Sequence, residues 1–510
     1  MGKRTRSFDG RVTKAMIKPL ARNALANVLQ TISGAALLFA LYRYINTTLG
    51  VEQLGVWSVV LATVSASRLA DMGLSGGVVR FVARDRARGE LDRAGKVVDT
   101  AALSLMVTIG AILPLVYPLL GKLLPHLFEG SYLAQALAIL PYALVSLWLT
   151  VVAAVFQGGL DGCQRMDLRA GLVVSGQALL LALAFWLVPQ HGLLGLAWAQ
   201  IGQGLFLAVI GRFLLRNALP TLTRLPRRWR KHVLREMLGY GANLQAATLF
   251  MLLVDPVANA LMARFGGPAA AGYFAMANQV VLKARSVIVT ANQAVVPYIA
   301  TLAEGETGRL DGLYRNNMRV LVFVTIPAFA LLFAWAGVFS WLLTGGYQAE
   351  FVFFLGLVCL AWCVNTFTGP AYFMNMGTGR VGWNTLAHLM MGTLNVSLGL
   401  LLGSFYGAHG VLYAYTIAVI TASGVLIVAF QHQNRLNWRD AFSREHLGLM
   451  VASVVVVAFT WTAPLQITSG TPIGTAIGLV LPPFLLGLAI IYHPMRGQFL
   501  SWLTARVPRT

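Results

Sequence analysis

Two apolar stretches of the chain, 54–74 and 272–300, carry arginines where a membrane-spanning helix normally has no charge. The first contains Arg68 and the second Arg285. A charge in the middle of a spanning helix costs roughly 2.5 to 3.5 kcal/mol to insert, so it is retained where it has a partner or a task. Arginine suits phosphate chemistry because its planar guanidinium donates two parallel hydrogen bonds to an oxyanion. The two stretches therefore contain the first candidates for a functional site.

Three further charged residues accompany these arginines. Asp71 lies three residues after Arg68, on the same helical face, where it can pair with Arg68 or form a salt bridge between helices. Lys283 is two residues from Arg285, so the two side chains point about 200° apart around the helix and do not face one site equally. Lys283 is a further candidate for the functional site or the partner of Asp255. Asp255 is in turn a counterion or a site for a proton or sodium ion.

The elements that must position these residues are membrane-spanning helices. The 510 residues are 57% hydrophobic and only 11% charged, compared with about 25% charged in soluble domains. Fourteen apolar stretches are each long enough to cross a hydrocarbon core of about 30 Å. They are 22–44, 54–74, 97–119, 132–157, 170–188, 193–213, 238–263, 272–300, 317–338, 350–376, 384–404, 410–430, 447–464 and 473–492. The fold class is all-α and polytopic.

The net charge of +21 is distributed as in a membrane protein and not as in a nucleic-acid-binding protein. With the N-terminus inside and the sides alternating, 33 of the 39 Lys and Arg residues fall on the inner side. This asymmetry places both termini in the cytoplasm by the positive-inside rule. We see no removable signal peptide, and we expect the first span to direct its own insertion. Arg43 and Arg264 lie at outer helix ends, where snorkelling to the interface explains them, and both are weak candidates for ligand release.

The chain contains a long internal repeat. Gly50, Gly55 and Arg68 shifted by 217 positions fall on Gly267, Gly272 and Arg285, and the outer turn that starts at Gly192 matches the turn at Gly407 after a shift of 215. Six spans per half is an even number, so both halves enter the membrane in the same sense and form a parallel repeat. We expect this division: tail 1–20, N-lobe 21–213, basic linker 214–236, C-lobe 237–431, two extra helices 447–492 and tail 493–510.

Uncharged polar residues in the spans are weaker candidates. Asn27 and Gln30 share one face of the first span, and such residues more often bond to a neighbouring helix than to a substrate. We expect the same of four polar residues in the second half, His388, Asn365, Asn375 and Asn395. We expect the three cysteines to be packing residues. No metal-spaced His/Cys cluster, phosphate-cradling glycine loop or nucleophile elbow occurs, and the short outer loops leave no room for a catalytic domain. We expect neither an enzyme nor a bound cofactor.

The order of these features resembles a known superfamily. The features are fourteen spans, of which twelve form two six-helix lobes, the turn LGVEQLGVW from Leu49 to Trp57, the sequence DMGL at Asp71, and YGAHG from Tyr406 to Gly410. From about residue 20 to 492 the chain resembles the multidrug/oligosaccharidyl-lipid/polysaccharide exporter superfamily, and within it the bacterial polysaccharide-repeat flippases.

The resemblance implies a central cavity between two lobes and alternating access. The implied substrate is an undecaprenyl-pyrophosphate-linked oligosaccharide, moved from the cytoplasmic to the periplasmic leaflet of the inner membrane for polysaccharide biosynthesis. Arg68, Arg285 and Lys283 would hold the pyrophosphate. In the similar lipid II flippases the two extra helices form a groove for the lipid tail. Implied partners are the lipid-linked oligosaccharide, membrane lipids and other polysaccharide-assembly proteins, but not nucleic acid. Coupling to a proton or sodium gradient is a further expectation.

Two alternatives stay open on the sequence. A lipid II flippase would bind the same pyrophosphate, so the charged residues do not separate it from an oligosaccharide flippase. A drug or small-cation antiporter of the same superfamily would need acidic residues in its cavity, whereas the charges in the spans here are mostly basic and the first span has no acid.

Overall fold

The computed structural model describes residues 10–65, 74–248, 251–293, 299, 310–436, 444–462 and 472–497, and the regular structure in these ranges is helical throughout. The predicted all-α membrane fold is confirmed. The chain divides into two compact units. The first is formed by Met1–Tyr44 and Thr63–Ala246, and the second by Ile45–Ala62 and Ala247–Thr510. The predicted lobes were defined by the sequence repeat and not by contacts, so their ranges remain a prediction.

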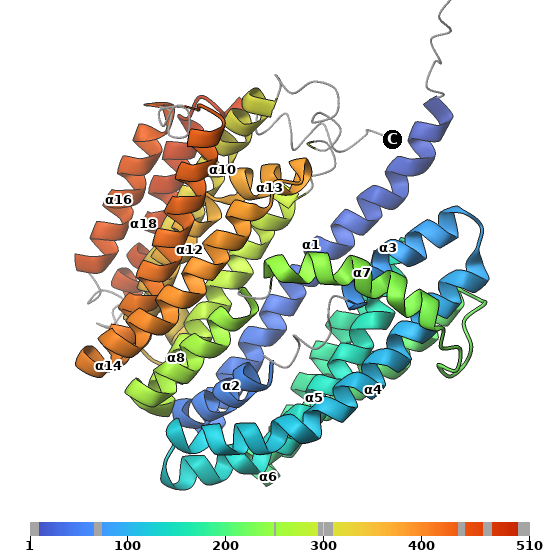
Figure 1. Ribbon diagram of the computed structural model, residues 1–510. Helices are drawn as coiled ribbons and strands as arrows, with labels where there is room; N and C mark the ends of the chain where they lie inside the picture. Colours follow the sequence, from blue (N-terminus) through green and yellow to red (C-terminus); the bar gives the residue numbers. More distant parts are fainter. Residues whose placement is uncertain are drawn as a thin grey trace, which may run out of the picture. The chain divides into compact units, whose positions relative to one another are not determined.

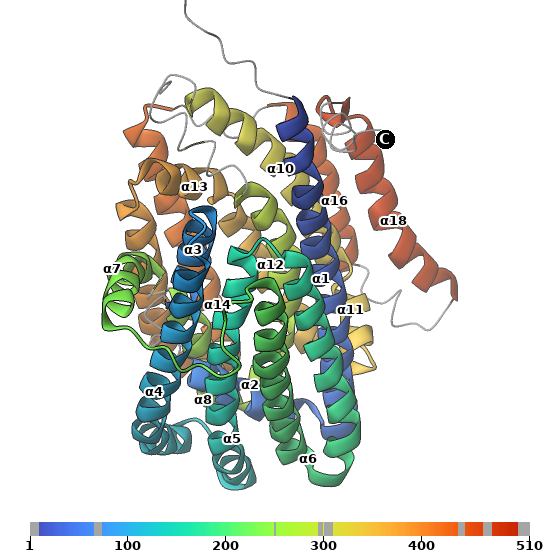
Figure 2. The same ribbon diagram turned by 90° about the vertical axis from the view of Figure 1, so that its right-hand side faces the viewer.

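The first unit is a bundle in which α5 has α3, α4 and α6 as neighbours (Figure 2). Small residues allow this packing, because a Cβ on Gly162 of α5 would lie 2.9 Å from the backbone oxygen of Val79 on α3. Its helices are most of α1 (Gly10–Leu49), α3 (Leu74–Ala87), α4 (Leu91–Leu123), η2 (Leu124–His126), α5 (Gly130–Gly162), α6 (Met166–Ala218) and α7 (Lys231–Thr248).

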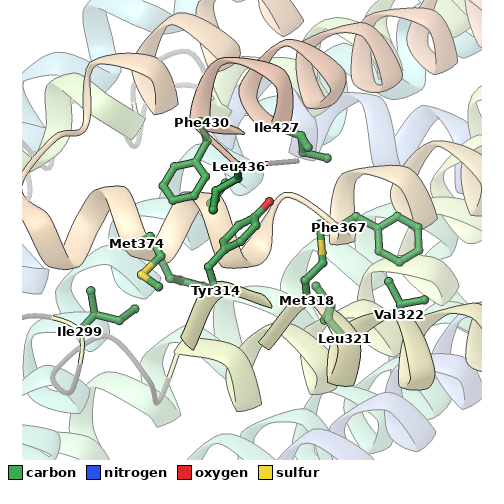
Figure 3. Packing of buried hydrophobic residues seen from close by; sticks show 12 residues of the cluster. Ile299, Tyr314, Met318, Leu321, Val322, Phe367, Met374, Ile427, Phe430 and Leu436 are labelled. Atoms are coloured by element: carbon green, nitrogen blue, oxygen red, sulfur yellow. The ribbon is translucent and has the colours of Figure 1, made fainter. Parts of the chain in front are cut away.

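The second unit places α12 between α8, α10 and α14 (Figure 1). Its helices are α2 (Val51–Ser65), α8 (Met251–Gln293), α10 (Leu310–Ala334), α11 (Ala336–Thr344), α12 (Ala349–Thr366), α13 (Gly369–Thr378), α14 (Gly382–Gln433), η4 (Arg444–His446), α16 (Leu447–Thr462) and α18 (Pro472–Ile491). Part of the bundle is held together by a cluster of buried apolar residues. Figure 3 shows Tyr314 of α10 in this cluster among Phe430, Leu436 and Met374. The Tyr314 and Phe430 rings are 4.8 Å apart.

The two C-terminal helices pack on α10, with Val456 of α16 and Leu486 of α18 against Ala330 (Figure 1). A polar contact adds to this apolar packing. Arg319 of α10 donates two hydrogen bonds, of 2.5 and 2.7 Å, to the carboxylate of Glu445 in η4. The segment that leads into α16 is thus joined to α10 by polar contacts as well.

A buried histidine pair continues this polar contact. The backbone N–H of Met495 donates to Nδ1 of His493, so Nε2 of His493 carries the proton and donates to Nδ1 of His446 at 3.0 Å. His446 Nε2 then lies 3.5 Å from the Glu445 carboxylate. The end of α18, η4 and α10 are joined by one directed chain of polar groups.

Seven of the described helices are long and apolar enough to span a membrane. Two of them, α6 with 53 residues and α14 with 52, bend at Gly192 and Gly407, and a span needs only about 20 residues. Each therefore has the length of two spans. The number fourteen stays a prediction.

The backbone supports the internal repeat. Most residues with positive φ in the described ranges occur in pairs separated by the repeat shift, including Gly192 (φ 56°, ψ −133°) with Gly407 (φ 59°, ψ −139°). The other pairs are Gly50 with Gly267, Gly130 with Gly345, and Gln164 with Gly379. Because a positive φ is rare outside glycine, its recurrence at matched positions indicates that the two halves share their turns.

Repeat-related glycines also meet where α2 crosses α8. A Cβ on Gly55 would lie 1.7 Å from the backbone oxygen of Pro268, and one on Gly272 would lie 2.5 Å from that of Val51. The shift of 217 that relates Gly55 to Gly272 also relates Val51 to Pro268. The contact is reciprocal, as at a two-fold interface, and it requires glycine on both sides.

Candidate functional site

Five helices of the second unit, α8, α10, α12, α13 and α14, enclose a cavity of about 130 Å³. A water molecule has a share of about 30 Å³ in the liquid, so this space holds a few waters or one phosphate-sized group and not a sugar chain. Its wall is mostly apolar with a few polar side chains, as in ligand pockets generally. The polar and aromatic members used below are Arg285, Asn292, Trp362, Asn365, Tyr372 and His388.

Arg285 is the charged residue of this wall, and no acidic residue contributes to it among the described residues. Its Nη2 donates to Oδ1 of Asn365 at 2.7 Å, and Asn365 Nδ2 donates to Ser423 at 2.9 Å. The guanidinium lies 4.7 Å from the ring centroid of Trp362, a cation–π contact that holds its plane. Its buried Nε has no hydrogen-bond partner in the described part of the chain. The arginine is positioned with a donor unused.

Asp255 belongs to a polar network next to this cavity. Asn278 donates to Oδ1 of Asp255 at 3.2 Å, and Trp362 Nε1 donates to the hydroxyl of Tyr415 at 3.0 Å. The Tyr415 hydroxyl is 3.5 Å from Asp255 Oδ1, a long contact. The carboxyl group is thus connected through Tyr415 to the indole ring on which Arg285 stacks.

The described residues show no ion pair between Lys283 and Asp255, which was one of the two alternatives for Lys283. The helix α8 bends at Gly267 (φ 74°, ψ −179°), and Asn278 on its second arm lies opposite Asp255 on the first. Lys283 is five residues further along, about 7.5 Å at 1.5 Å per residue. Lys283 is half-buried and does not line the cavity that Arg285 lines.

Helix-to-helix bonding was expected of four polar residues, and three show it. Asn365 bonds to Arg285 and Ser423, Asn375 donates to Asn384, and Asn395 donates to the backbone oxygen of Val254. His388 differs, because neither ring nitrogen has a hydrogen-bond partner among the described residues. Its ring contacts Tyr372 edge to face at 5.8 Å and lines the cavity.

The other candidates are distributed as follows. Arg68 and Asp71 lie outside the described residues, so the expected pair of arginines, one from each half, stays a prediction. Asn27 accepts a hydrogen bond of 2.7 Å from Arg169 of α6, so it bonds to a neighbouring helix. Gln30 is half-buried, and its Oε1 has no partner within the described ranges. Arg43 and Arg264 are exposed, as snorkelling residues are expected to be.

The first unit has a polar cluster of a different kind, where the connection 219–230 folds back on α4. Asp99 is fully buried and accepts from Arg212 at 3.0 Å and from Thr223 at 2.9 Å, with Arg228 at 3.4 Å. Arg228 also binds Asp92 at 2.7 Å. Arg212 and Arg228 are therefore bound within the unit.

Sequence reasoning found Arg285 but missed most of its surroundings. Asn365 and His388 were visible as polar residues in spans, whereas nothing local distinguishes Trp362 or Tyr415 from packing aromatics. The repeat gives one usable signal, because the positions 215 residues before Trp362, Asn365 and His388 are Leu147, Thr150 and Val173. Trp362 and His388 therefore correspond to apolar residues of the first half, and Asn365 corresponds to a threonine.

Comparison with solved structures shows the same fold. An inward-facing multidrug resistance transporter of the MATE family in the MOP superfamily matches with a TM-score of 0.70 at 16% identity, covering 81% of this chain and 98% of that one. The lipid II flippase MurJ, in an inward closed conformation, matches with 0.69 at 12% identity, covering 95% and 99%. A MOP superfamily transporter from Pyrococcus furiosus, described as having a binding pocket of reverse polarity, matches with 0.61 at 16%, covering 82% and 95%.

The match to MurJ covers more of this chain than the other two matches do. It leaves only 5% of the chain unmatched, and α16 and α18 together are longer than that, so the match includes at least part of these two helices. No curated protein matches the chain.

A family model described as polysaccharide biosynthesis protein matches residues 20–303, more than half of the sequence and a range that includes both Arg68 and Arg285. The chain belongs to this polysaccharide biosynthesis protein family, and with its fold this confirms the predicted membership of the multidrug/oligosaccharidyl-lipid/polysaccharide exporter superfamily.

Proposed function

We propose that the protein is a flippase that moves an undecaprenyl-pyrophosphate-linked oligosaccharide across the bacterial inner membrane, from the cytoplasmic to the periplasmic leaflet, by alternating access. Its family and its transporter fold support this class of function. Both termini are cytoplasmic in this proposal, as the distribution of basic residues indicates. The protein is a transporter and not an enzyme, and its partners are the lipid-linked substrate, membrane lipids and other polysaccharide-assembly proteins.

The observation that carries the proposal is the unused Nε of Arg285 in a cavity with no described acidic residue. An anionic group entering this cavity would gain a charge-assisted hydrogen bond without displacing an existing counterion. A cationic drug would meet uncompensated like charge there, which argues against the antiporter alternative. The phosphates of a polyprenyl-linked sugar have the required charge and acceptors, while the sugars exceed the volume and must lie elsewhere.

Arg285→Gln tests this function because it removes the charge and keeps a polar side chain of similar length. We expect loss of surface polysaccharide in cells and of lipid-linked oligosaccharide translocation in proteoliposomes, with an unchanged amount of protein in the membrane. Arg496→Gln is the matched control, since this arginine of the same unit is exposed and outside the cavity. Wild-type translocation by Arg285→Gln would overturn the proposal. The same assay with lipid II separates the two flippase alternatives.

We further propose that Asp255 couples transport to a proton or sodium gradient. In support, its carboxyl group bonds to Asn278 and Tyr415 and to no cationic side chain among the described residues, so a small cation could neutralise it. Asp255→Asn is expected to keep substrate binding and to remove the dependence of translocation on an imposed ion gradient. An unchanged gradient dependence in this variant would contradict the assignment.

A further inference from the structure

His388 is a half-buried histidine whose two ring nitrogens have no hydrogen-bond partner in the described part of the chain. It lies on α14 and borders the cavity together with Ala387 and Met391 from the same face of the helix. The edge of the Tyr372 ring contacts it at 5.8 Å, with an angle of 69° between the rings. The imidazole is held by packing and lines the cavity, and its two buried nitrogens have no hydrogen-bond partner among the described residues.

Buried polar groups are normally hydrogen-bonded, so an unbonded one requires an explanation. In the same unit Asn365, Asn375 and Asn395 each donate a hydrogen bond to a neighbouring helix or residue. Arg285 Nε and the two nitrogens of His388 are without partners, and both residues face the same enclosed space. A ligand in this space would satisfy donors from two sides.

The chemistry of these donors selects the ligand. A neutral imidazole offers one N–H donor, an imidazolium offers two, and the Nε–H of arginine offers one more. A phosphate group has several acceptor oxygens and a negative charge, and a volume that suits a cavity of about 130 Å³. A hydroxyl headgroup would satisfy one donor at most and would leave the guanidinium charge uncompensated. The position 215 residues before His388 is Val173, so the first half of the chain carries no copy of this histidine.

We propose that His388 is a second phosphate-contacting side chain of this cavity, and that Arg285 and His388 together select a diphosphate headgroup over an uncharged one. This inference rests on the proposed function and adds to it a specificity-determining residue that belongs to the second half alone. Arg285 supplies the charge. His388 supplies a donor from the opposite helix, which fixes the position of the phosphate between α8 and α14.

Binding to the detergent-solubilised full chain tests the inference, with three probes measured by calorimetry: geranylgeranyl diphosphate, geranylgeraniol and inorganic pyrophosphate. We expect His388→Leu to weaken diphosphate-lipid binding about tenfold, the effect of one hydrogen bond to a charged group, and to leave geranylgeraniol binding unchanged. His388→Asn keeps an N–H donor and should recover most of the affinity. His409→Leu is the matched control, because His409 lies on the same helix, outside the cavity and close to Glu350.

The outcomes separate this inference from the function on which it rests. If Arg285→Gln loses diphosphate binding while His388→Leu binds as wild type does, His388 has no role and the flippase proposal stands. If Arg285→Gln also binds normally, the phosphate site itself is wrong. Binding of inorganic pyrophosphate with no binding of the diphosphate lipid would assign the cavity to a soluble anion and overturn the lipid assignment. Equal loss for geranylgeraniol would show a packing role and overturn it as well.

Discussion

The two units of the molecule use buried charge in different ways. In the first unit Asp99 is fully buried, but hydrogen bonds from Arg212 and Thr223 hold its carboxylate and so fasten the connection between α6 and α7. In the second unit Arg285 is held by Asn365 and by the face of Trp362, and this cavity-lining arginine keeps an Nε without a partner among the described residues. The Asp99 carboxylate is bonded within the fold, whereas Arg285 borders a cavity in which a ligand could lie.

The largest loss of stability is expected from Asp99→Ala, which tests whether the buried charge of the first unit is structural. Removing one partner leaves the buried Arg212 uncompensated, which typically costs about 3 to 5 kcal/mol. We expect a lower melting temperature in detergent and less protein in the membrane, whereas Arg285→Gln should change neither by a comparable amount. Asp92→Ala serves as the control, since the Asp92 side chain is 57% exposed and its pair with Arg228 should contribute at most about 1 kcal/mol. Equal stability of Asp99→Ala and Asp92→Ala would break the comparison.

A smaller effect is expected where α2 crosses α8, the helix that carries Arg285. A Cβ on Gly55 would lie 1.7 Å from the backbone oxygen of Pro268, and a backbone atom cannot move aside as a flexible side chain does. Overpacking of this kind costs about 1 to 3 kcal/mol. We expect Gly55→Ala to lower the melting temperature by several degrees.

Gly312→Ala is the matched control for the Gly55 variant. Gly312 is exposed within α10 of the same unit and has open space around its Cβ position. This substitution should stabilise the helix by about 0.4 to 1 kcal/mol. A Gly55→Ala protein as stable as the Gly312→Ala protein would show that the crossing does not require glycine.

The smallest effect is a pH dependence at the attachment of the C-terminal helices. Hydrogen bonds from Arg319 lower the pKa of Glu445, and burial lowers the pKa of His446 to about 4 and that of His493 below its usual value. For each group the unfolded state binds protons at a higher pH than the folded state does. Stability is therefore fully present above about pH 6.5 and falls as the pH drops toward 4.

Thermal unfolding at pH 7.5 and pH 5 measures this dependence. We expect a lower melting temperature at pH 5, and a shallower decline in His446→Gln, which cannot titrate. A wild-type melting temperature that is flat over this range would show that the chain of polar groups between α10 and α18 does not contribute to stability.

Much of this architecture could be predicted from the sequence, because hydropathy and the positions of glycines act locally. The shifts of 215 and 217 residues identify the repeat, and the paired positive φ angles of Gly192 and Gly407 support it. Arg285 stood out because a charge in an apolar stretch is visible without knowledge of its neighbours.

The partners of these residues could not be predicted in the same way. Asn278 lies opposite Asp255 because α8 bends at Gly267, so the register between its two arms decided that Lys283 was not the partner. Asp99 and Arg212 are 113 positions apart, so no local pattern in the sequence relates them. His388 was expected to bond to a neighbouring helix, and only the structure shows that it lines a cavity and that its nitrogens have no partner among the described residues.

The most direct test of the central claim, that the second unit holds a phosphate of the carried lipid at Arg285, is an electron cryomicroscopy structure of the protein in nanodiscs with undecaprenyl pyrophosphate. We predict density for a phosphate group in the cavity between α8, α12 and α14, within hydrogen-bond distance of Arg285 Nε. A headgroup resolved at another place, with this cavity empty, would contradict the claim.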